Sequence, residues 1–166
     1  MADNVTMQID RLDAAIIEMF TDEPGLGVLE CSRRLKVARA TVQGRLDRLH
    51  RGGVITGITP QIDPAAFGYP VITFCSIEIS QGMGHETVFA SMSAIPEILE
   101  MHTVSGASDI LVKIVAKSTT DLQRVLDALA QAPGVARTSS VIVLSTHVEN
   151  RILPLLHAAA AEAEDS

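Results

Sequence analysis

The sequence predicts an α+β protein in two parts, an N-terminal winged helix-turn-helix over residues 1–60 and a C-terminal ferredoxin-like βαββαβ domain over residues 71–152. Helical spacing of apolar residues gives way, after about residue 60, to alternating β-branched runs. A linker over residues 61–70, flanked by Pro60 and rich in proline, separates the two patterns. The second part also repeats weakly, because a shift of 37 residues places Val88 on Val125 and Pro96 on Pro133.

The composition is that of a folded protein. Apolar residues make up 47% of the 166 residues, which excludes disorder for most of the chain. No apolar run is long enough to span a membrane, and the N-terminus lacks the basic and apolar regions of a signal peptide, so a cytoplasmic protein is expected. Cys31 and Cys75 lie in different predicted elements, and we interpret them as small buried hydrophobic residues rather than a bridge or a metal pair.

The charge of the chain is unevenly distributed. The net charge is −7, yet the segment 31–57 carries seven Lys or Arg residues and one acid. Residues 65–166 hold 5 basic and 11 acidic side chains. The acidic C-terminal part should repel nucleic acid, so any contact with DNA must come from the basic segment.

Three helices and a strand are predicted in the N-terminal part. Apolar residues at helical spacing predict helices over 9–20, 28–36 and 39–51, and Gly52-Gly53 ends the third. The run 54–59 is expected to form the strand of a wing. Two short basic helices joined by a tight turn are typical of a helix-turn-helix.

The C-terminal part has the order β-α-β-β-α-β. The six predicted elements span 71–80, 86–94, 98–105, 110–116, 119–131 and 135–148. Both faces of the first strand, and all of Val141–Leu144, are largely apolar. Because two helices cover only one face of such a sheet, a second copy is expected on the other, giving a dimeric α/β sandwich. The tail 153–166 is Ala-rich and acidic, and we interpret it as a frayed helix without a function.

Several stretches together resemble the Lrp/AsnC (feast/famine) family of bacterial and archaeal transcription regulators. The stretches are Ile9–Asp13, Val42–Leu49 with Gly52–Gly57, Val104–Asp109, and Pro133–Val135 with Thr138–Leu144. The resemblance covers roughly residues 8–155 in the right order. It departs at Ala38, where the family usually has a capping Ser, at Gly44 inside the third helix, and in the turn sequence Gly-Ala-Ser-Asp.

The position of the basic residues predicts how DNA is contacted. The N-terminal part of the second helix of a helix-turn-helix faces base edges, and here it carries Arg39, Ala40, Thr41 and Gln43. The Arg39 guanidinium can donate two hydrogen bonds to guanine O6 and N7, and the Gln43 amide can pair with adenine N6 and N7. Phosphate or backbone contacts are expected from Arg33, Arg34, Arg45 and Arg48. The alternative is that these are solvated charges on helix surfaces.

The resemblance implies that an amino acid or a similar small metabolite binds the C-terminal domain. The implied residues are Ser105, Gly106, Ala107, Ser108 and Asp109 in the turn, with Thr138, Ser139 and Ser140 on the last strand. The turn offers backbone N–H groups for a carboxylate, and Asp109 suits an ammonium group. The small Ala107 and Ser108 favour a larger or more apolar ligand than Asn or Gly. The alternative is a plain tight turn capped by Asp109.

The expected function is therefore that of a sequence-specific, effector-responsive transcriptional regulator that binds double-stranded DNA. The resemblance implies a homodimer that assembles to an octamer, located at the nucleoid in the cytoplasm, with no cofactor and no membrane. The histidines show no metal-ligand spacing, and Gly25-Leu26-Gly27 is not a phosphate loop, so no enzyme is expected. Two alternatives are a low-specificity, chromatin-organising DNA binder and an effector-binding module whose helix-turn-helix contacts proteins.

Overall fold

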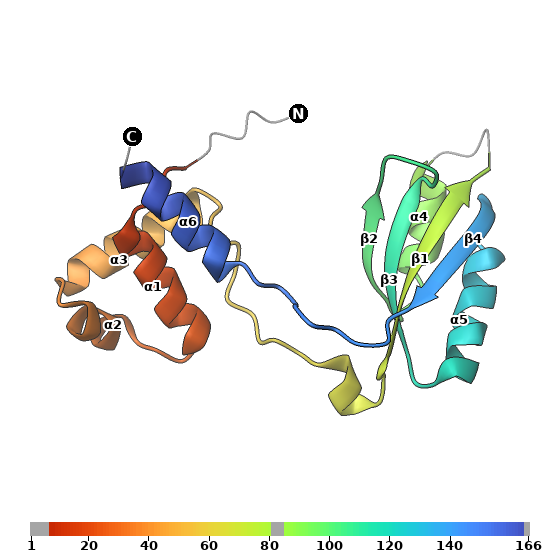
Figure 1. Cartoon of the computed structure of the whole chain (residues 1–166), viewed down its shortest axis with the longest axis horizontal. Helices are drawn as coiled ribbons and strands as arrows, with labels where there is room; N and C mark the ends of the chain where they lie inside the picture. The colour runs from red at the N-terminus through yellow and green to blue at the C-terminus, as the bar shows by residue number, and fades with distance from the viewer. Residues whose placement is uncertain (1–6, 81–84, 165–166) are drawn as a thin grey trace. The chain divides into compact units, whose positions relative to one another are not determined.

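The computed structural model describes residues 7–80 and 85–164, and the chain divides into two compact units (Figure 1). One unit combines the described residues of Met1–Pro60 with those of Val148–Ser166. The other spans Gln61–His147 and includes the linker, where Pro64–Phe67 form a short 3₁₀ turn. In the described part of the chain, no helix is long and apolar enough to cross a membrane.

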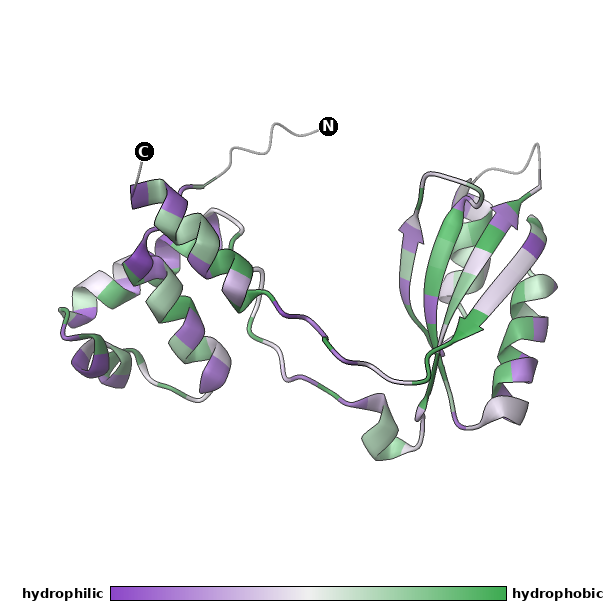
Figure 2. Ribbon diagram, viewed as in Figure 1, coloured by the Kyte–Doolittle hydropathy of each residue, from purple (hydrophilic) through white to green (hydrophobic). Residues whose placement is uncertain are grey.

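The first unit contains four helices. They are α1 (Arg11–Asp22), α2 (Val28–Leu35), α3 (Arg39–Arg51) and α6 (Leu153–Glu164). Apolar side chains of the first three form one core around Ile16, Cys31, Val42 and Leu46. The polar faces of α2 and α3 remain outside (Figure 2). The three predicted N-terminal helices are therefore confirmed, and Cys31 is a buried free thiol, as is Cys75 in the second unit.

The predicted strand of the wing is wrong. Residues 54–59 form no strand, and the N–H groups of Val54 and Ile55 instead donate to the carbonyl of Leu49 at distances of 3.0 and 3.2 Å. Ile55 also packs against the core of the first unit. A wing needs a second strand to pair with, and the apolar run here leads straight into Pro60 and the linker.

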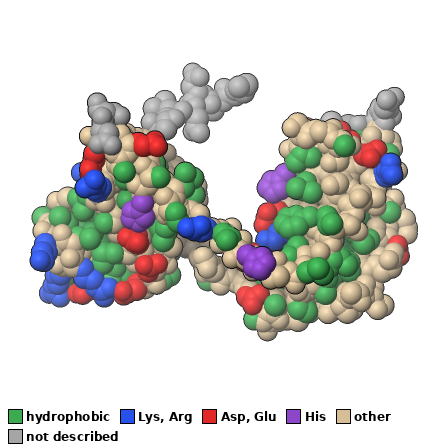
Figure 3. All heavy atoms as spheres, viewed as in Figure 1, with side chains coloured by type: hydrophobic (Ala, Val, Ile, Leu, Met, Phe, Trp, Pro, Cys, Tyr) green, Lys and Arg blue, Asp and Glu red, His purple; other side chains and the backbone are tan. Residues whose placement is uncertain are grey.

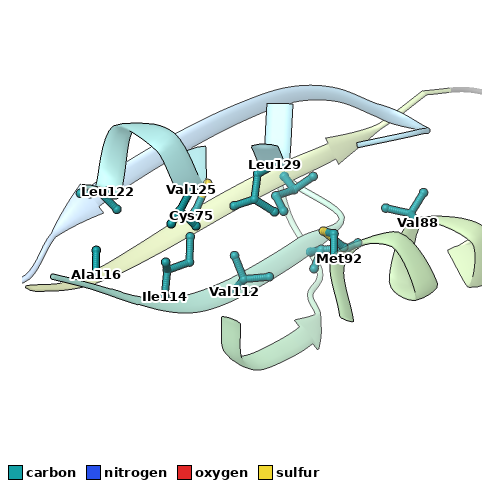
Figure 4. Packing of buried hydrophobic residues seen from close by; sticks show 11 residues of the cluster. Cys75, Val88, Met92, Val112, Ile114, Ala116, Leu122, Val125 and Leu129 are labelled. Carbon is teal, nitrogen blue, oxygen red and sulfur yellow. The ribbon is translucent and has the colours of Figure 1, made fainter. Parts of the chain in front are cut away.

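The second unit is a four-stranded antiparallel sheet with two helices on one face. Its elements are β1 (Val71–Ile79), α4 (His85–Ser93), β2 (Ile98–Thr103), β3 (Ile110–Ala116), α5 (Thr119–Ala130) and β4 (Val135–Ile142). The strand order is β2-β3-β1-β4, which confirms the ferredoxin-like arrangement. Figure 4 shows the core, where Val88 and Met92 of α4 and Leu122, Val125 and Leu129 of α5 pack on the strands.

The last strand is shorter than predicted. It ends at Ile142 rather than Val148, with one further hydrogen bond of 2.9 Å from the Val143 N–H to the Ile72 carbonyl. Its neighbour β1 begins at Val71 and is preceded by Pro70, so the chain beyond Val143 has no partner strand in β1.

The tail is helical, as predicted, but the helix is packed rather than frayed. Leu153–Glu164 form a helix, and Leu156 and Ala160 are buried against Ala14 of α1. Their positions, with Leu153, follow helical spacing and make one apolar face. The tail therefore belongs to the unit that contains the helix-turn-helix.

Candidate DNA-binding and ligand-binding sites

The turn between α2 and α3 forms the centre of the basic surface. Lys36 ends α2 in the left-handed conformation, with φ 55°, and Ala38 precedes the first residue of α3. Lys and Arg side chains gather over this part of the first unit (Figure 3). Arg39, Ala40 and Thr41 are exposed there, as the sequence predicts for the start of a recognition helix.

Two of the predicted phosphate contacts are instead tied to α1. Arg45 donates to Asp10 and, at 3.0 Å, to Asp13, while Arg48 donates to Asp13. Asp13 is completely buried, so its carboxylate needs these two guanidinium groups as partners. This placement argues against the predicted roles of Arg45 and Arg48 at phosphates. The network fixes the position of α3 on α1.

Other predicted contacts are also partly occupied. Arg34 pairs with Glu23 and, at 3.1 Å, with Glu30, and Arg33 lies 3.7 Å from Glu30. The Gln43 amide donates to Asp47 at 2.8 Å, although its side chain is exposed. To bind adenine, the Gln43 amide would have to give up its hydrogen bond to Asp47 and donate to the base instead.

Lys36 and Arg39 are the basic side chains of this surface best placed to meet DNA. Both are exposed, and neither forms an ion pair or hydrogen bond through its side chain to another described residue. Lys36 was not among the predicted site residues, because the predicted contacts all lay within the two helices. Its position in the tight turn directly before the recognition helix is the signal that identifies it.

Stability should depend on the charge of Asp10. Burial by itself raises the pKa of this carboxyl group, but hydrogen bonds from Arg45 and from the Asp13 backbone N–H outweigh burial, and the pKa lies below its ordinary value of 3.8. A depressed pKa stabilises the fold above the unfolded-state pKa, and this contribution is lost as the pH falls through the folded-state value. Urea unfolding followed by circular dichroism should therefore show a loss of stability below about pH 4 that is smaller in Asp10→Asn. An equal loss in that variant would contradict the role of Asp10.

The start of α3 lacks a side-chain cap. Ala38 occupies the N-cap position in an extended conformation, with φ −65° and ψ 144°, and provides no acceptor. Ala38→Ser should stabilise the first unit by about 1 kcal/mol, because the hydroxyl can accept from the backbone N–H of the first turn. Thermal unfolding measures this gain. An unchanged melting temperature would show that the backbone N–H groups in the first turn of α3 already have hydrogen-bond partners.

The predicted ligand residues of the turn, Ser105 to Asp109, lie at one end of the sheet, between β2 and β3. Gly106 has φ +127°, a conformation that favours glycine, in the turn between β2 and β3. The Asp109 carboxylate accepts a hydrogen bond of 2.7 Å from the Ile79 N–H, and its own N–H donates to the Ile77 carbonyl at 2.9 Å. Asp109 therefore holds the turn against β1, in agreement with the capping alternative, and one of its oxygens is engaged.

The hydroxyl residues of β4 are separated from this turn by β1. Ile77 pairs with Ile110 of β3 on one side and with Thr138 of β4 on the other, so the three lie in one row across the sheet. The distance across two strand spacings is about 10 Å. Ser139 pairs with Ser76 and so lies on the face opposite Thr138 and Ser140. The structure thus places Thr138 and Ser140 on one face and Ser139 on the other.

A further cluster of polar side chains surrounds Glu100 on β2. His102 is exposed and lies 3.4 Å from Glu100, which also accepts from Lys113 at 3.1 Å. The Lys113 hydrogen bond, with a smaller contribution from His102, holds the pKa of Glu100 below its ordinary value. Among the described residues, no three His, Cys, Asp or Glu side chains are grouped to hold a metal ion.

Known proteins share both the sequence and the fold. The family described as the Lrp/AsnC ligand binding domain matches residues 72–153. The HTH-type transcriptional regulator FL11 of Pyrococcus horikoshii is 33% identical over 147 residues, covering 89% of this chain and 97% of its own.

Two solved structures show the same fold. AsnC of Escherichia coli superimposes with a TM-score of 0.81 at 24% identity, over 89% of this chain and all of its own. A regulator from Neisseria meningitidis in complex with L-Met gives a TM-score of 0.80 at 24% identity, over 90% of this chain and 99% of its own. The matched relatives are regulators rather than enzymes, which agrees with the sequence-based expectation. The helix-turn-helix, the ferredoxin-like sheet and the 33% identity over nearly the whole length of a curated regulator together establish that this chain belongs to the Lrp/AsnC family of transcriptional regulators.

Proposed function

We propose that the protein binds specific DNA sites through the turn between α2 and α3 and the first turn of α3, and that an amino acid bound to the sheet domain changes this binding. The observation that carries the proposal is the pair of exposed, unengaged cations Lys36 and Arg39 beside the exposed Thr41. Lys36 and the more weakly paired Arg33 contact phosphates, whereas Arg39 and Thr41 face base edges. Action on DNA places the protein at the nucleoid in the cytoplasm.

A gel-shift experiment tests the DNA-binding part of the proposal. The full chain is mixed with its own promoter region at a fixed salt concentration, with and without excess competitor DNA. A discrete complex that survives the competitor supports site-specific regulation. Smearing that disappears with rising salt indicates the low-specificity alternative, and no shift indicates that the helix-turn-helix contacts proteins instead.

We further propose that the ligand is an amino acid, held near Gly106 and Thr138. Backbone N–H groups of the turn receive its carboxylate, and hydroxyl groups of β4 receive other polar atoms. The small Ala107 and the half-buried Ser108 favour a larger or more apolar side chain than that of Asn or Gly. The complex of the Neisseria relative with L-Met supports this class of ligand.

Calorimetry across the twenty amino acids tests the ligand. The proposal expects binding by at least one large apolar amino acid, and binding that is weakened in Gly106→Val. This substitution places a β-branched residue at φ +127° and so should deform the turn. Binding by only the smallest amino acids, or by none, would contradict the proposal.

The open face of the sheet is proposed to pair with a second copy. Phe74 is 37% and Val141 67% exposed, and they are neighbours on the face opposite α4 and α5. Hydrophobic side chains gather on the visible face of this unit in Figure 3. Burying this patch gives a dimer whose two recognition helices meet half-sites about 34 Å apart, and dimers assemble further to an octamer. A monomer in sedimentation at micromolar concentration would overturn this assembly, and Val141→Asp should weaken it.

A further inference from the structure

One acidic side chain lies in the middle of the exposed face of the recognition helix α3. Asp47 is the single acid of the basic segment 31–57. The exposed residues Ala40, Gln43, Gly44 and Asp47 follow the spacing i, i+3, i+4 and i+7, so they share one face of α3. Helices that enter the major groove contact base edges with residues at this same spacing. Asp47 therefore belongs to the face of α3 that meets DNA.

Asp47 differs from the other acids near α3 because no cation neutralises it. Asp13 accepts from Arg45, and Glu30 accepts from Arg34. Asp47 forms no ion pair with another described residue, although α3 carries four arginines. A carboxylate placed against DNA is repelled by the phosphates, so it favours binding only where a base offers it a hydrogen-bond donor.

The Gln43 amide holds this carboxylate in place. Its Nε2 donates to the Asp47 Oδ1 at 2.8 Å, across one turn of the helix. A carboxylate only accepts hydrogen bonds, and the Asp47 Oδ2 accepts from no other described residue. The hydrogen bond also restrains the Asp47 side chain before DNA binds, which reduces the conformational entropy lost on binding. Asp47 thus presents one positioned, unused acceptor.

The neighbours of Asp47 on this face let the acceptor come close to a base. Ala40 and Gly44 add little bulk, and nothing outside the helix backbone and the two chain neighbours lies within 4 Å of where a Cβ on Gly44 would stand. A side chain as short as aspartate reaches a base edge only when the helix lies deep in the groove. Arg51 is exposed one turn beyond Asp47, and its Nε donates to the Asp47 backbone carbonyl at 3.2 Å. Its positive charge offsets the repulsion between this end of α3 and the phosphates.

We propose that Asp47 determines one base of the DNA site, by accepting a hydrogen bond from the N4 amino group of a cytosine in the major groove. This inference rests on the proposed binding of specific DNA sites through α3. Cytosine is the base whose own major-groove edge carries a donor and no acceptor. Guanine and thymine present acceptors that repel a carboxylate, and adenine places the acceptor N7 beside its amino group. Gln43 is then a positioning residue for Asp47, in place of the adenine contact that the sequence predicts.

Site selection from a library of random duplexes, carried out in parallel with the full-length wild type and Asp47→Ala, tests this contact. Each base pair of the recovered site is then replaced in turn, and binding is measured by fluorescence anisotropy at one salt concentration. In the wild type, one cytosine should be preferred over every other base by about 5-fold or more. In Asp47→Ala, this preference should fall below about 2-fold, while binding to scrambled DNA stays equal or rises because a negative charge is gone.

Two further variants separate a base contact from a simple change of charge. Asp22→Ala removes the same charge from the exposed end of α1, and it should leave every base preference unchanged. Asp47→Asn keeps the size of the side chain, but its amide can also donate to adenine N7, so adenine should become acceptable at the same position. The melting temperatures of all three variants should match that of the wild type, because both aspartates are exposed.

The possible results distinguish this inference from the proposed function. A full cytosine preference in Asp47→Ala, with raised affinity for every duplex, would overturn the role of Asp47 and leave it a repelled surface charge. Loss of preference at a base other than cytosine would overturn the assignment to the N4 amino group. A wild type that recovers no common sequence would overturn site-specific binding itself, and the cytosine contact with it.

Discussion

Replacing Asp13 by Ala is expected to destabilise the DNA-binding unit by about 1–3 kcal/mol, because it removes the buried carboxylate that accepts hydrogen bonds from Arg45 and Arg48. Asp13 is 0% exposed and accepts from Arg45 and Arg48. The Arg48 Nε is already buried without a partner among the described residues, so Arg48 loses its hydrogen bond to Asp13 while Arg45 keeps Asp10 as a partner. The loss is a large fraction of the stability of an ordinary domain.

Urea unfolding of the full chain, followed by circular dichroism, measures this loss. Asp22→Ala serves as the control, because Asp22 lies exposed in the last turn of the same helix. Its effect should stay within about 0.5 kcal/mol. If both variants unfold at the same urea concentration, the ion-pair network does not support the position of α3.

Replacing Arg39 by Ala should weaken binding to a specific site by about 1–3 kcal/mol for each half-site contact and relax the sequence preference at one base pair. Arg39 is exposed at the first position of α3 and is not engaged by another described residue. A bidentate contact with guanine explains both effects. Folding stability should not change, because the side chain has no structural partner to lose.

Arg34→Ala is the matched control for Arg39. Arg34 is also an exposed arginine of the helix-turn-helix, but Glu23 and Glu30 neutralise it, and the Glu23 hydrogen bond raises its pKa further. Its removal should weaken binding much less and leave the sequence preference intact. Fluorescence anisotropy at several salt concentrations, with specific and scrambled duplexes, distinguishes the two variants. Equal losses on both duplexes would show that Arg39 contacts phosphate only.

Periodicity in the sequence was sufficient to predict most of the fold. The ranges of α3 and β3 agree with the predicted ones, since helical and alternating spacing are local properties. The errors concern features that depend on distant partners. The strand at 54–59 has no second strand to pair with, and β4 ends beside the start of β1. The predicted C-terminal helix is packed instead of frayed because α1 presents an apolar face to it.

The candidate DNA-binding site was only partly predictable for the same reason. A count of basic residues treats Arg39 and Arg45 alike, but only the structure shows that Arg45 is paired with Asp10 and Asp13. A signal was nevertheless present, because acids spaced three apart on one helix match arginines spaced three apart on another. Lys36, in the turn, is recognised as a candidate DNA contact only once the structure shows that most arginines of α2 and α3 pair with carboxylates.

Selection of binding sites from genomic DNA, with and without amino acids, tests the central claim most directly. The full-length protein should recover a limited set of fragments that share two half-sites about one helical turn apart. At least one large apolar amino acid should change their recovery. Fragments without a common sequence, recovered equally under every condition and lost steeply with added salt, would contradict a ligand-responsive, site-specific regulator.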